Sequence, residues 1–146
     1  MGCIPALKNA EIVRYGVMHR NTFINAPKLI NEFNQLKSCK NIFFAGQITG
    51  VEGYIESITS GYLSALYMRK YINNNDLVTM PSEIAMGSLM NYLVQSNPDS
   101  FQPMNINFGL MPKLEVKIKN KKERNLRYAE RALMILKQYQ ECYIND

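Results

Sequence analysis

The pattern of apolar and polar positions predicts short strands in the first third of the chain. Residues 12–18 (IVRYGVM) and 21–25 (NTFIN) are rich in Val, Ile, Phe, Tyr and Thr, which favour β-structure. Pro27 cannot donate a backbone hydrogen bond to a sheet, so it ends the second run. Residues 28–40 are polar and mixed, and we expect a short helical or irregular connection there. The continuous apolar run 41–46 (NIFFAG) is typical of a strand buried on both faces in a parallel sheet.

Apolar side chains at three- and four-residue spacing predict helices at about 52–71, 81–95 and 119–143. The first predicted helix has an apolar stripe and a second face of small residues, so it can lie close to a neighbouring sheet. The stripe comprises Ile55, Ile58, Tyr62 and Leu66, and the small residues are Ser57, Gly61, Ser64 and Ala65. The third is basic in its first half and core-like in its second, with Leu126, Ala129, Leu133 and Leu136 at coiled-coil-like intervals. Residues 101–112 show neither the helical nor the strand period and predict a long loop. Such loops are often functional, but they more commonly cover a core.

Length and composition fit one globular domain, since 146 residues with 47% hydrophobic side chains can bury a core. No run approaches eighteen apolar residues, so we expect no membrane span. The start has no secretory pattern, and we expect a cytoplasmic protein. Three widely spaced cysteines and the single histidine, His19, form no ligand cluster, so neither a metal site nor a disulfide framework is expected.

The positive charge is concentrated near the C-terminus. The net charge is +5, yet residues 1–112 hold eight Lys or Arg against seven Asp or Glu, whereas residues 113–146 hold nine against five. Such a basic segment would bind RNA through its phosphates, with an affinity that falls as salt rises. The alternative is a solvated helix face in which Glu123 and Arg127 pair at i,i+4.

The string GQITGVEGYIES contains three glycines, Gly46, Gly50 and Gly53, where the apolar run passes into the first predicted helix. Free N–H groups and the dipole at a helix start favour a phosphate or another anionic group, and glycine lets a ligand approach the backbone. However, GxxxGxxG is not the dinucleotide fingerprint GxGxxG, so a tight turn without a ligand is the competing interpretation. Glu52 and Glu56 are four residues apart and suit a sugar, a hydroxyl or a ring N–H, or are solvated caps. Tyr54 would stack on a planar ring or pack on a neighbouring strand.

Four strings, in order, resemble the C-terminal third of the bacterial folate- and FAD-dependent tRNA (uracil-5-)-methyltransferases: RYGVMHRNTFINAPKL, NIFFAGQITGVEGYIESITSGYLSA, SFQPMNINFGLMP and KNKKERNLRYAERAL. The resemblance extends over nearly the whole chain from about Ile4. GQITGVEGYIES is specific to this family and is shared only loosely with the related flavoproteins that modify tRNA uridines with carboxymethylaminomethyl groups. The FQPMN and VEGYIES strings argue against that sister family.

The resemblance implies an α/β fold: residues 1–72 would be the C-terminal part of a glutathione-reductase-like FAD-binding domain, and residues 73–146 a helical region with the basic helix. The domain would be incomplete, because the family's N-terminal GxGxxG and its reactive cysteines are not in this chain. The chain would therefore contain no catalytic residue and would need an N-terminal FAD-binding partner. The surfaces left uncovered would also promote self-association.

The resemblance also implies where ligands bind. Gly46 and Gln47 would lie against the ribityl and pyrophosphate groups of FAD, and Gly50–Gly53 would present N–H groups to the isoalloxazine edge, with Tyr54 near the ring face. The cofactor-binding residues are then Gly46, Gln47, Gly50, Val51, Glu52, Gly53 and Tyr54. Folate carboxylates, RNA phosphate or the flavin would meet Arg14, His19, Arg20 and Asn21. The tRNA backbone would meet Lys117, Lys119, Lys121, Lys122 and Arg124.

The implied reaction moves a one-carbon unit from methylenetetrahydrofolate through reduced FAD to C5 of a T-loop uridine in tRNA, with NADH or NADPH as reductant. The alternative function is a non-catalytic RNA-binding remnant without flavin activity of its own. This alternative requires salt-sensitive tRNA binding by the isolated chain, and an electrophoretic shift assay without any shift in low salt would exclude it.

Overall fold

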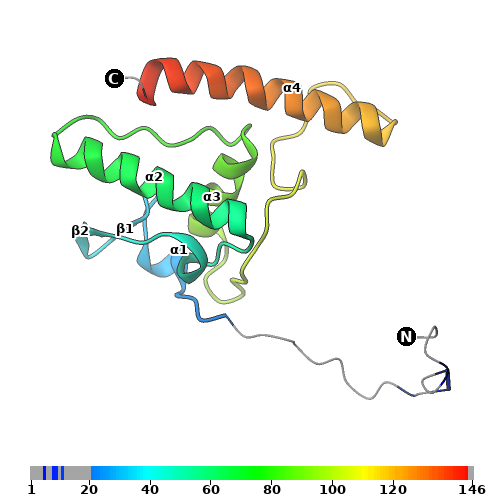
Figure 1. The fold of residues 1–146 in the computed structure, drawn as a ribbon, viewed down its shortest axis with the longest axis horizontal. Coiled ribbons are helices and arrows are strands. Elements are labelled where there is room, and N and C mark those ends of the chain that lie inside the picture. The colour runs from blue at the N-terminus through cyan, green and yellow to red at the C-terminus, as the bar shows by residue number, and fades with distance from the viewer. Residues whose placement is uncertain (1–4, 6–7, 10, 12–20, 145–146) are drawn as a thin grey trace.

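The computed structural model describes residues 5, 8–9, 11 and 21–144. Three long helices dominate the described part: α2 (Tyr54–Ile72), α3 (Ala85–Gln95) and α4 (Lys121–Tyr139). A short helix, α1 (Ala26–Leu29), and a hairpin of β1 (Gln35–Leu36) and β2 (Cys39–Phe43) precede them. A 3₁₀ turn (Gly46–Thr49) leads into α2, and a π-helical turn (Gln140–Ile144) follows α4. In Figure 1, the hairpin and α1 lie on one side of α2, and α4 runs alongside α2 on the other.

The apolar run 41–46 does not form the predicted buried parallel strand. β2 pairs antiparallel with β1, with Gln35 opposite Phe43 and Leu36 opposite Cys39. Residues 39–42 are exposed. The position of β1 explains the antiparallel pairing. Two parallel strands must be joined by a long crossover, whereas only two residues connect β1 to β2. A short apolar run does not by itself reveal which partner a strand has.

Residues 21–25 were predicted as a strand and are irregular in the structure. No described strand lies beside them. Their polar groups are paired in other ways: Ile24 N–H donates to Ile48 O at 2.8 Å, and Asn25 Nδ2 donates to Pro98 O at 2.8 Å. Pro27 then stands in the first turn of α1, where a missing N–H is harmless. The predicted strand 12–18 lies outside the described residues.

The three predicted helices are confirmed, but the predicted apolar stripe of α2 is mostly exposed. Ile55, Ile58 and Tyr62 are 72%, 70% and 54% exposed, and of that stripe only Leu66 is buried. The face that packs on the body instead comprises Ser60, Leu63, Ser64, Leu66, Tyr67 and Lys70. Spacing alone could not choose the buried face, because apolar side chains occur nearly all round this helix. The predicted apolar stripe of α4 is also largely exposed, since Leu126 is 57% and Leu133 67% exposed.

One hydrophobic core joins the segments before and after residue 72. Val51, Leu63 and Tyr67 pack in the same cluster as Leu89 and Leu93 of α3. The C-terminal end is attached through tyrosines: Tyr139 Oη donates to Val78 O at 3.0 Å, and the Tyr143 ring lies 6.5 Å from that of Tyr67. Burial raises the pKa of the Tyr67, Tyr139 and Tyr143 hydroxyls, so they stay neutral hydrogen-bonding groups well into the alkaline range. No helix among the described residues is both long and apolar enough to cross a membrane.

Two helical glycines provide a matched test of this packing. A Cβ on Gly87 in α3 would overlap the carbonyl oxygens of Met80 and Pro81, whereas a Cβ on Gly61 in α2 would meet nothing within 4 Å. Gly87→Ala is therefore expected to lower the free energy of unfolding by about 1–3 kcal/mol. Gly61→Ala is expected to raise it by about 1 kcal/mol through helix propensity. Urea unfolding of both variants of the isolated chain measures the difference, and equal effects would contradict the described packing of α3.

Candidate functional site

The glycine-rich turn between β2 and α2 is built on backbone conformations that favour glycine. Gly46, Gly50 and Gly53 have φ angles of 69°, 92° and 95°. Gly46 N–H donates to Ser60 Oγ of α2 at 3.0 Å, and Thr49 Oγ1 donates to Gly46 O at 2.7 Å. The turn is therefore fastened to the inner face of α2 at its beginning.

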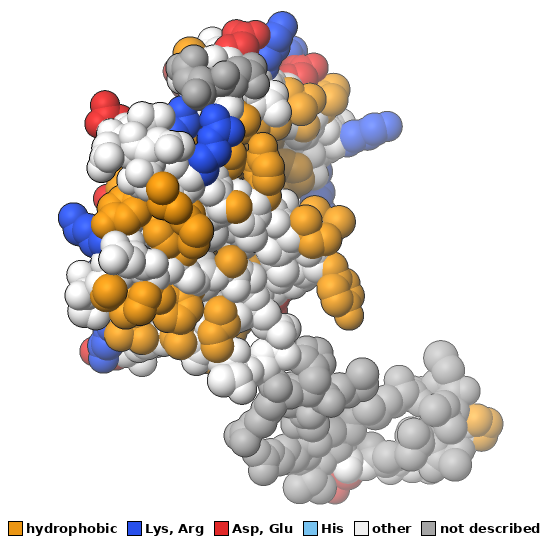
Figure 2. All heavy atoms as spheres, turned by 60° about the vertical axis from the view of Figure 1, so that its left-hand side comes forward, with side chains coloured by type: hydrophobic (Ala, Val, Ile, Leu, Met, Phe, Trp, Pro, Cys, Tyr) orange, Lys and Arg blue, Asp and Glu red, His pale blue; other side chains and the backbone are white. Residues whose placement is uncertain are grey.

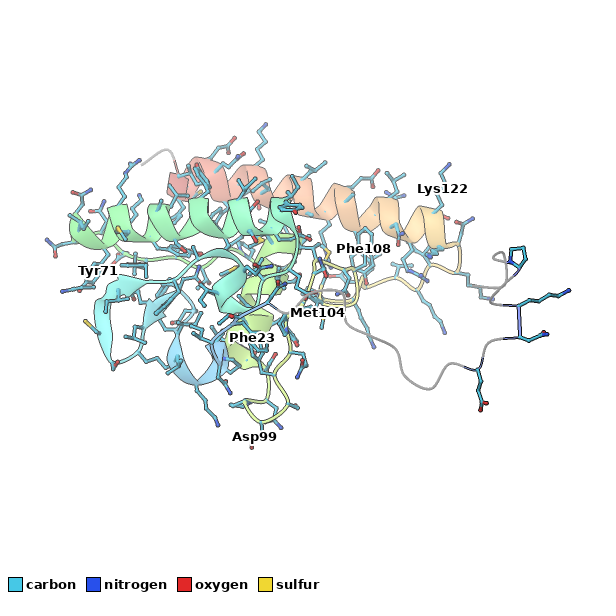
Figure 3. The ribbon with its side chains drawn as sticks, turned by 60° about the horizontal axis from the view of Figure 1, so that its bottom comes forward. Phe23, Tyr71, Asp99, Met104, Phe108 and Lys122 are labelled. Atoms are coloured by element: carbon cyan, nitrogen blue, oxygen red, sulfur yellow. The ribbon has the colours of Figure 1, made fainter. Side chains whose placement is uncertain are left out.

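The loop at residues 101–112 fastens the other end of the turn. Val51 and Met104 form a parallel bridge, in which Met104 N–H donates to Gly50 O at 2.9 Å and Glu52 N–H donates to Met104 O at 3.0 Å. The Phe101 ring lies so close to Gly50 that a Cβ there would overlap it. Figure 3 shows Met104 in the loop near the amino-terminal end of α2. The predicted loop thus has a defined task, which is to hold the glycine turn.

The amino-terminal end of α2 keeps unused hydrogen-bond donors. The first backbone bond of the helix runs from Ser57 N–H to Gly53 O at 3.0 Å, and no described side chain caps the helix. The N–H groups of the first turn, from Tyr54 to Glu56, therefore have no partner within the helix. Together with the helix dipole they favour an electron-rich group that lies next to Gly53 on the axis of the helix.

A cleft of about 830 Å³ opens at this helix end. Four of the predicted cofactor residues line it, namely Gln47, Glu52, Gly53 and Tyr54. Asn21, predicted from the folate- and RNA-contacting segment, lies in the same wall. Ser57 and Asn105 also line it and were not predicted as site residues. Ser57 stands one turn after Gly53, and Asn105 follows the FQPM string, so both positions could have been proposed from the helix period and the loop.

The other predicted cofactor residues do not line the cleft. Val51 is completely buried, Gly50 lies against Phe101, and Gly46 lies against Ser57. Because Gly50 N–H donates to Gln47 O and Glu52 N–H donates to Met104 O, these two amides are occupied within the chain. In this structure, the donors that remain for a ligand begin at the helix start rather than along the whole turn.

The two carboxylates, Glu52 and Glu56, do not share one face of a helix. Glu52 precedes the helix, which starts at Tyr54, and its side chain lines the cleft. Glu56 reaches toward the loop, where its Oε1 accepts a hydrogen bond from Ile106 N–H at 3.4 Å. Glu52 is therefore the carboxylate available to a ligand, and Glu56 supports the loop. Tyr54 does not pack on a neighbouring strand, because it is 92% exposed.

Of the residues predicted to meet the folate, the RNA or the flavin, Arg14, His19 and Arg20 lie outside the described residues, so only Asn21 is placed. No group of three or more His, Cys, Asp or Glu side chains that could hold a metal ion is found within the described part of the chain.

The basic residues 113–127 surround the start of α4. Lys117, Lys119, Lys121 and Lys122 are exposed, and Arg124 is half-buried. Among the described residues, the two ion pairs are Lys28–Asp99 and Arg127–Glu130, so none of these four lysines is paired. The expected Glu123–Arg127 pair is replaced by Arg127–Glu130 at 3.1 Å. Asn120 Oδ1 caps the helix by accepting from Lys122 and Glu123 N–H groups. Lys122 projects from the end of α4 away from the body (Figure 3).

Comparison with known proteins gives concordant matches. A family model described as glucose inhibited division protein A matches residues 1–76. Methylenetetrahydrofolate–tRNA-(uracil-5-)-methyltransferase TrmFO of Listeria monocytogenes is 54% identical over 140 residues, which cover 96% of this chain and 32% of that protein. Proteins of the same name from Bacillus velezensis and Bacillus subtilis are 57% and 55% identical over 130 residues, covering 89% of this chain and 30% of each relative. The chain thus spans about a third of the length of the curated relatives it matches.

Proposed function

Because the chain belongs to the family of glucose inhibited division protein A, we propose that it supplies one wall of a flavin site in a folate-dependent tRNA (uracil-5-)-methyltransferase. The observation that carries the proposal is the cleft at the start of α2, where unused backbone donors, Gln47, Glu52 and Tyr54 meet. The relatives named as such enzymes support the same reaction class. The other wall would come from an N-terminal FAD-binding portion that carries GxGxxG.

The residues of the cleft fit the polar edge of a flat ring better than they fit a phosphate. The amides of the first turn of α2 would donate to ring carbonyl oxygens, and the Glu52 carboxylate, which would repel a phosphate, suits a ring N–H or a sugar hydroxyl. Gly53 leaves the approach open, since its backbone has no Cβ. Tyr54, which is 92% exposed, offers an aromatic face for stacking. In this proposal Gly46, Gly50 and Val51 shape the turn, and Gln47 reaches the ribityl arm.

FAD would supply the redox and one-carbon chemistry when bound. The residues of this chain would bind and orient it: the fixed amides at the α2 start hold the ring edge, and the Met104 bridge keeps the turn rigid. A site held by backbone on rigid elements suits a reaction in which a folate, a flavin and an extruded base must meet in one geometry. We assign no catalytic residue to this chain.

The basic segment would hold the tRNA backbone during the reaction. Four exposed lysines, without ion-pair partners in the described part of the chain, lie there with the positive end of the α4 dipole. Such groups bind phosphates without reading sequence. Asn21, in the wall of the cleft, would contact the folate, the RNA or the flavin. We further propose NADH or NADPH as the source of electrons, and the cytoplasm as the location.

A completed chimera tests the proposal. It joins this chain to the N-terminal two thirds of the Bacillus subtilis relative, in place of the matching residues there. Incubated with methylenetetrahydrofolate, a reduced nicotinamide cofactor and unmodified tRNA, the chimera is expected to form 5-methyluridine in the T-loop, as measured by mass spectrometry of nucleosides. The N-terminal portion alone is the negative control, and the intact relative is the positive control. A folded chimera that binds flavin but leaves the tRNA unmodified would contradict the proposal.

The alternative, an RNA-binding remnant, is favoured by one observation: the residues of the basic segment take no part in lining the cleft. This alternative predicts that the isolated chain binds tRNA in low salt and that the chimera does not bind FAD.

A further inference from the structure

The outer side of α2 carries an apolar surface that no described residue covers. We define this outer stripe as Tyr54, Ile55, Ile58, Tyr62 and Ile72, with exposed fractions of 92%, 72%, 70%, 54% and 68%. Tyr54, Ile58, Tyr62 and Ile72 are spaced by four, four and ten residues, so they follow one line along the helix, in which the exposed Arg69 stands between Tyr62 and Ile72. The line is about 27 Å long at 1.5 Å per residue. Figure 2 shows hydrophobic side chains gathered in patches on one face of the molecule.

A helix that is apolar on two opposite sides is built to be buried on both. The inner side of α2 already packs in the core through Leu63, Leu66 and Tyr67. Large contiguous apolar patches are rare on proteins that work alone and mark interaction surfaces. The outer stripe therefore has the composition of an interface rather than of a solvated face.

Gly61 adds an independent observation. It stands in the middle of α2, where glycine costs about 1 kcal/mol of helix stability relative to alanine. Nothing lies within 4 Å of the place where its Cβ would be, so no contact within the described chain requires a glycine. Gly61 and the exposed Ala65, four residues apart on the same side of α2, have the smallest side chains there, so a neighbouring backbone or side chain could approach the helix closely.

We propose that the outer stripe is the docking surface for the polypeptide that forms the remaining two thirds of the relatives. The relatives contain that polypeptide in one chain with the matching region, which makes up 32% of their length. The stripe is also continuous with the flavin-site cleft through Tyr54, which belongs to both. A polypeptide that closes the cleft at the start of α2 would therefore run on to the stripe. The residues of the stripe are apolar and the charged residue on the same line, Arg69, is basic, so the occupant is apolar and carries no basic group opposite Arg69.

The inference takes the identity of its partner from the proposed function, but its test does not depend on flavin or on activity. Ile58→Cys is made in the isolated chain and in the completed chimera, and the rate of alkylation is measured on the peptide that contains it. The matched control is Leu133→Cys on α4, where the exposed fraction is 67% against 70% for Ile58. Tyr62→Cys provides a second position on the stripe.

Alkylation at both stripe positions is expected to be at least about tenfold slower in the chimera than in the isolated chain, because reaction then requires opening of the interface. The rate at the control position should stay within about twofold, since α4 carries no part of the stripe. Equal rates at the stripe positions in the two proteins would overturn the proposal, even if the chimera were active. Slow alkylation in the isolated chain that becomes faster on dilution would also overturn it, because a second copy would then be the occupant.

Discussion

Replacing Gly53 with valine is expected to lower the FAD affinity of the completed chimera by about a hundredfold, equivalent to about 2.8 kcal/mol. Gly53 has φ 95° and ψ 146°, a conformation that β-branched residues avoid. A Cβ there would also overlap the Glu56 carboxylate. The valine would therefore rotate the first amides of α2 away from the ligand and place its methyl groups in the cleft.

The affinity is measured by titration of FAD fluorescence, and circular dichroism checks that the helices persist. Gly109→Val is the control, since Gly109 is an exposed loop glycine outside the cleft. We expect that control to bind FAD within about twofold of the unchanged chimera, because surface substitutions away from a site have small effects. An unchanged affinity in the Gly53 variant, with the fold intact, would show that the ligand does not approach this helix end.

Reversing the charge of Lys117, Lys119 and Lys121 together is expected to weaken tRNA binding at least tenfold in low salt and to reduce the slope of log affinity against log salt by about two to three. These side chains are exposed, have no ion-pair partner among the described residues, and lie around the positive end of the α4 dipole. For each phosphate contact that is lost, tRNA binding releases about one counterion fewer. Electrophoretic shifts at several salt concentrations measure both quantities.

A triple charge reversal elsewhere separates local contact from net charge. Lys28, Lys40 and Lys137 are exposed and lie outside the basic residues 113–127, so changing them to Glu alters the net charge equally. We expect this control to weaken binding less than about threefold, through long-range attraction alone. Equal losses in the two triple variants would contradict a specific tRNA-contacting segment.

The existence of the long helices could be predicted from the sequence, but the direction in which α2 faces could not. Periodicity identifies a helix whenever apolar residues recur at three or four positions, and α2 meets that condition on two sides at once. Ile58 and Leu63 are equally apolar, yet one is 70% exposed and the other is completely buried. The choice depends on which partner is present, and a single sequence does not contain that information.

The strands were harder to predict because pairing is not a local property. The apolar run at 41–46 was expected inside a parallel sheet, and in the described chain its nearest available partner is β1. Residues 21–25 have strand composition but no described partner strand, and they use side-chain and isolated backbone bonds instead. β-propensity therefore described the residues correctly without fixing their structure.

The candidate site was predicted in its location and only partly in its details. The glycines, the helix start and the exposed tyrosine were visible in the string GQITGVEGYIES. The bridge between Val51 and Met104 was not, because it joins positions more than fifty residues apart. That bridge occupies the Glu52 amide and so moves the available donors toward Gly53 and the first turn of α2.

The central claim is that the residues of this chain form one wall of a flavin site and that the part of the relatives outside the matched third would supply the other. The most direct test is to titrate FAD into the isolated chain, into the isolated N-terminal two thirds of the relative, and into the completed chimera. We expect tight binding of one FAD by the chimera and binding to each separate part that is weaker by at least about a hundredfold. A folded chimera that binds FAD no more tightly than its N-terminal portion alone would contradict the claim.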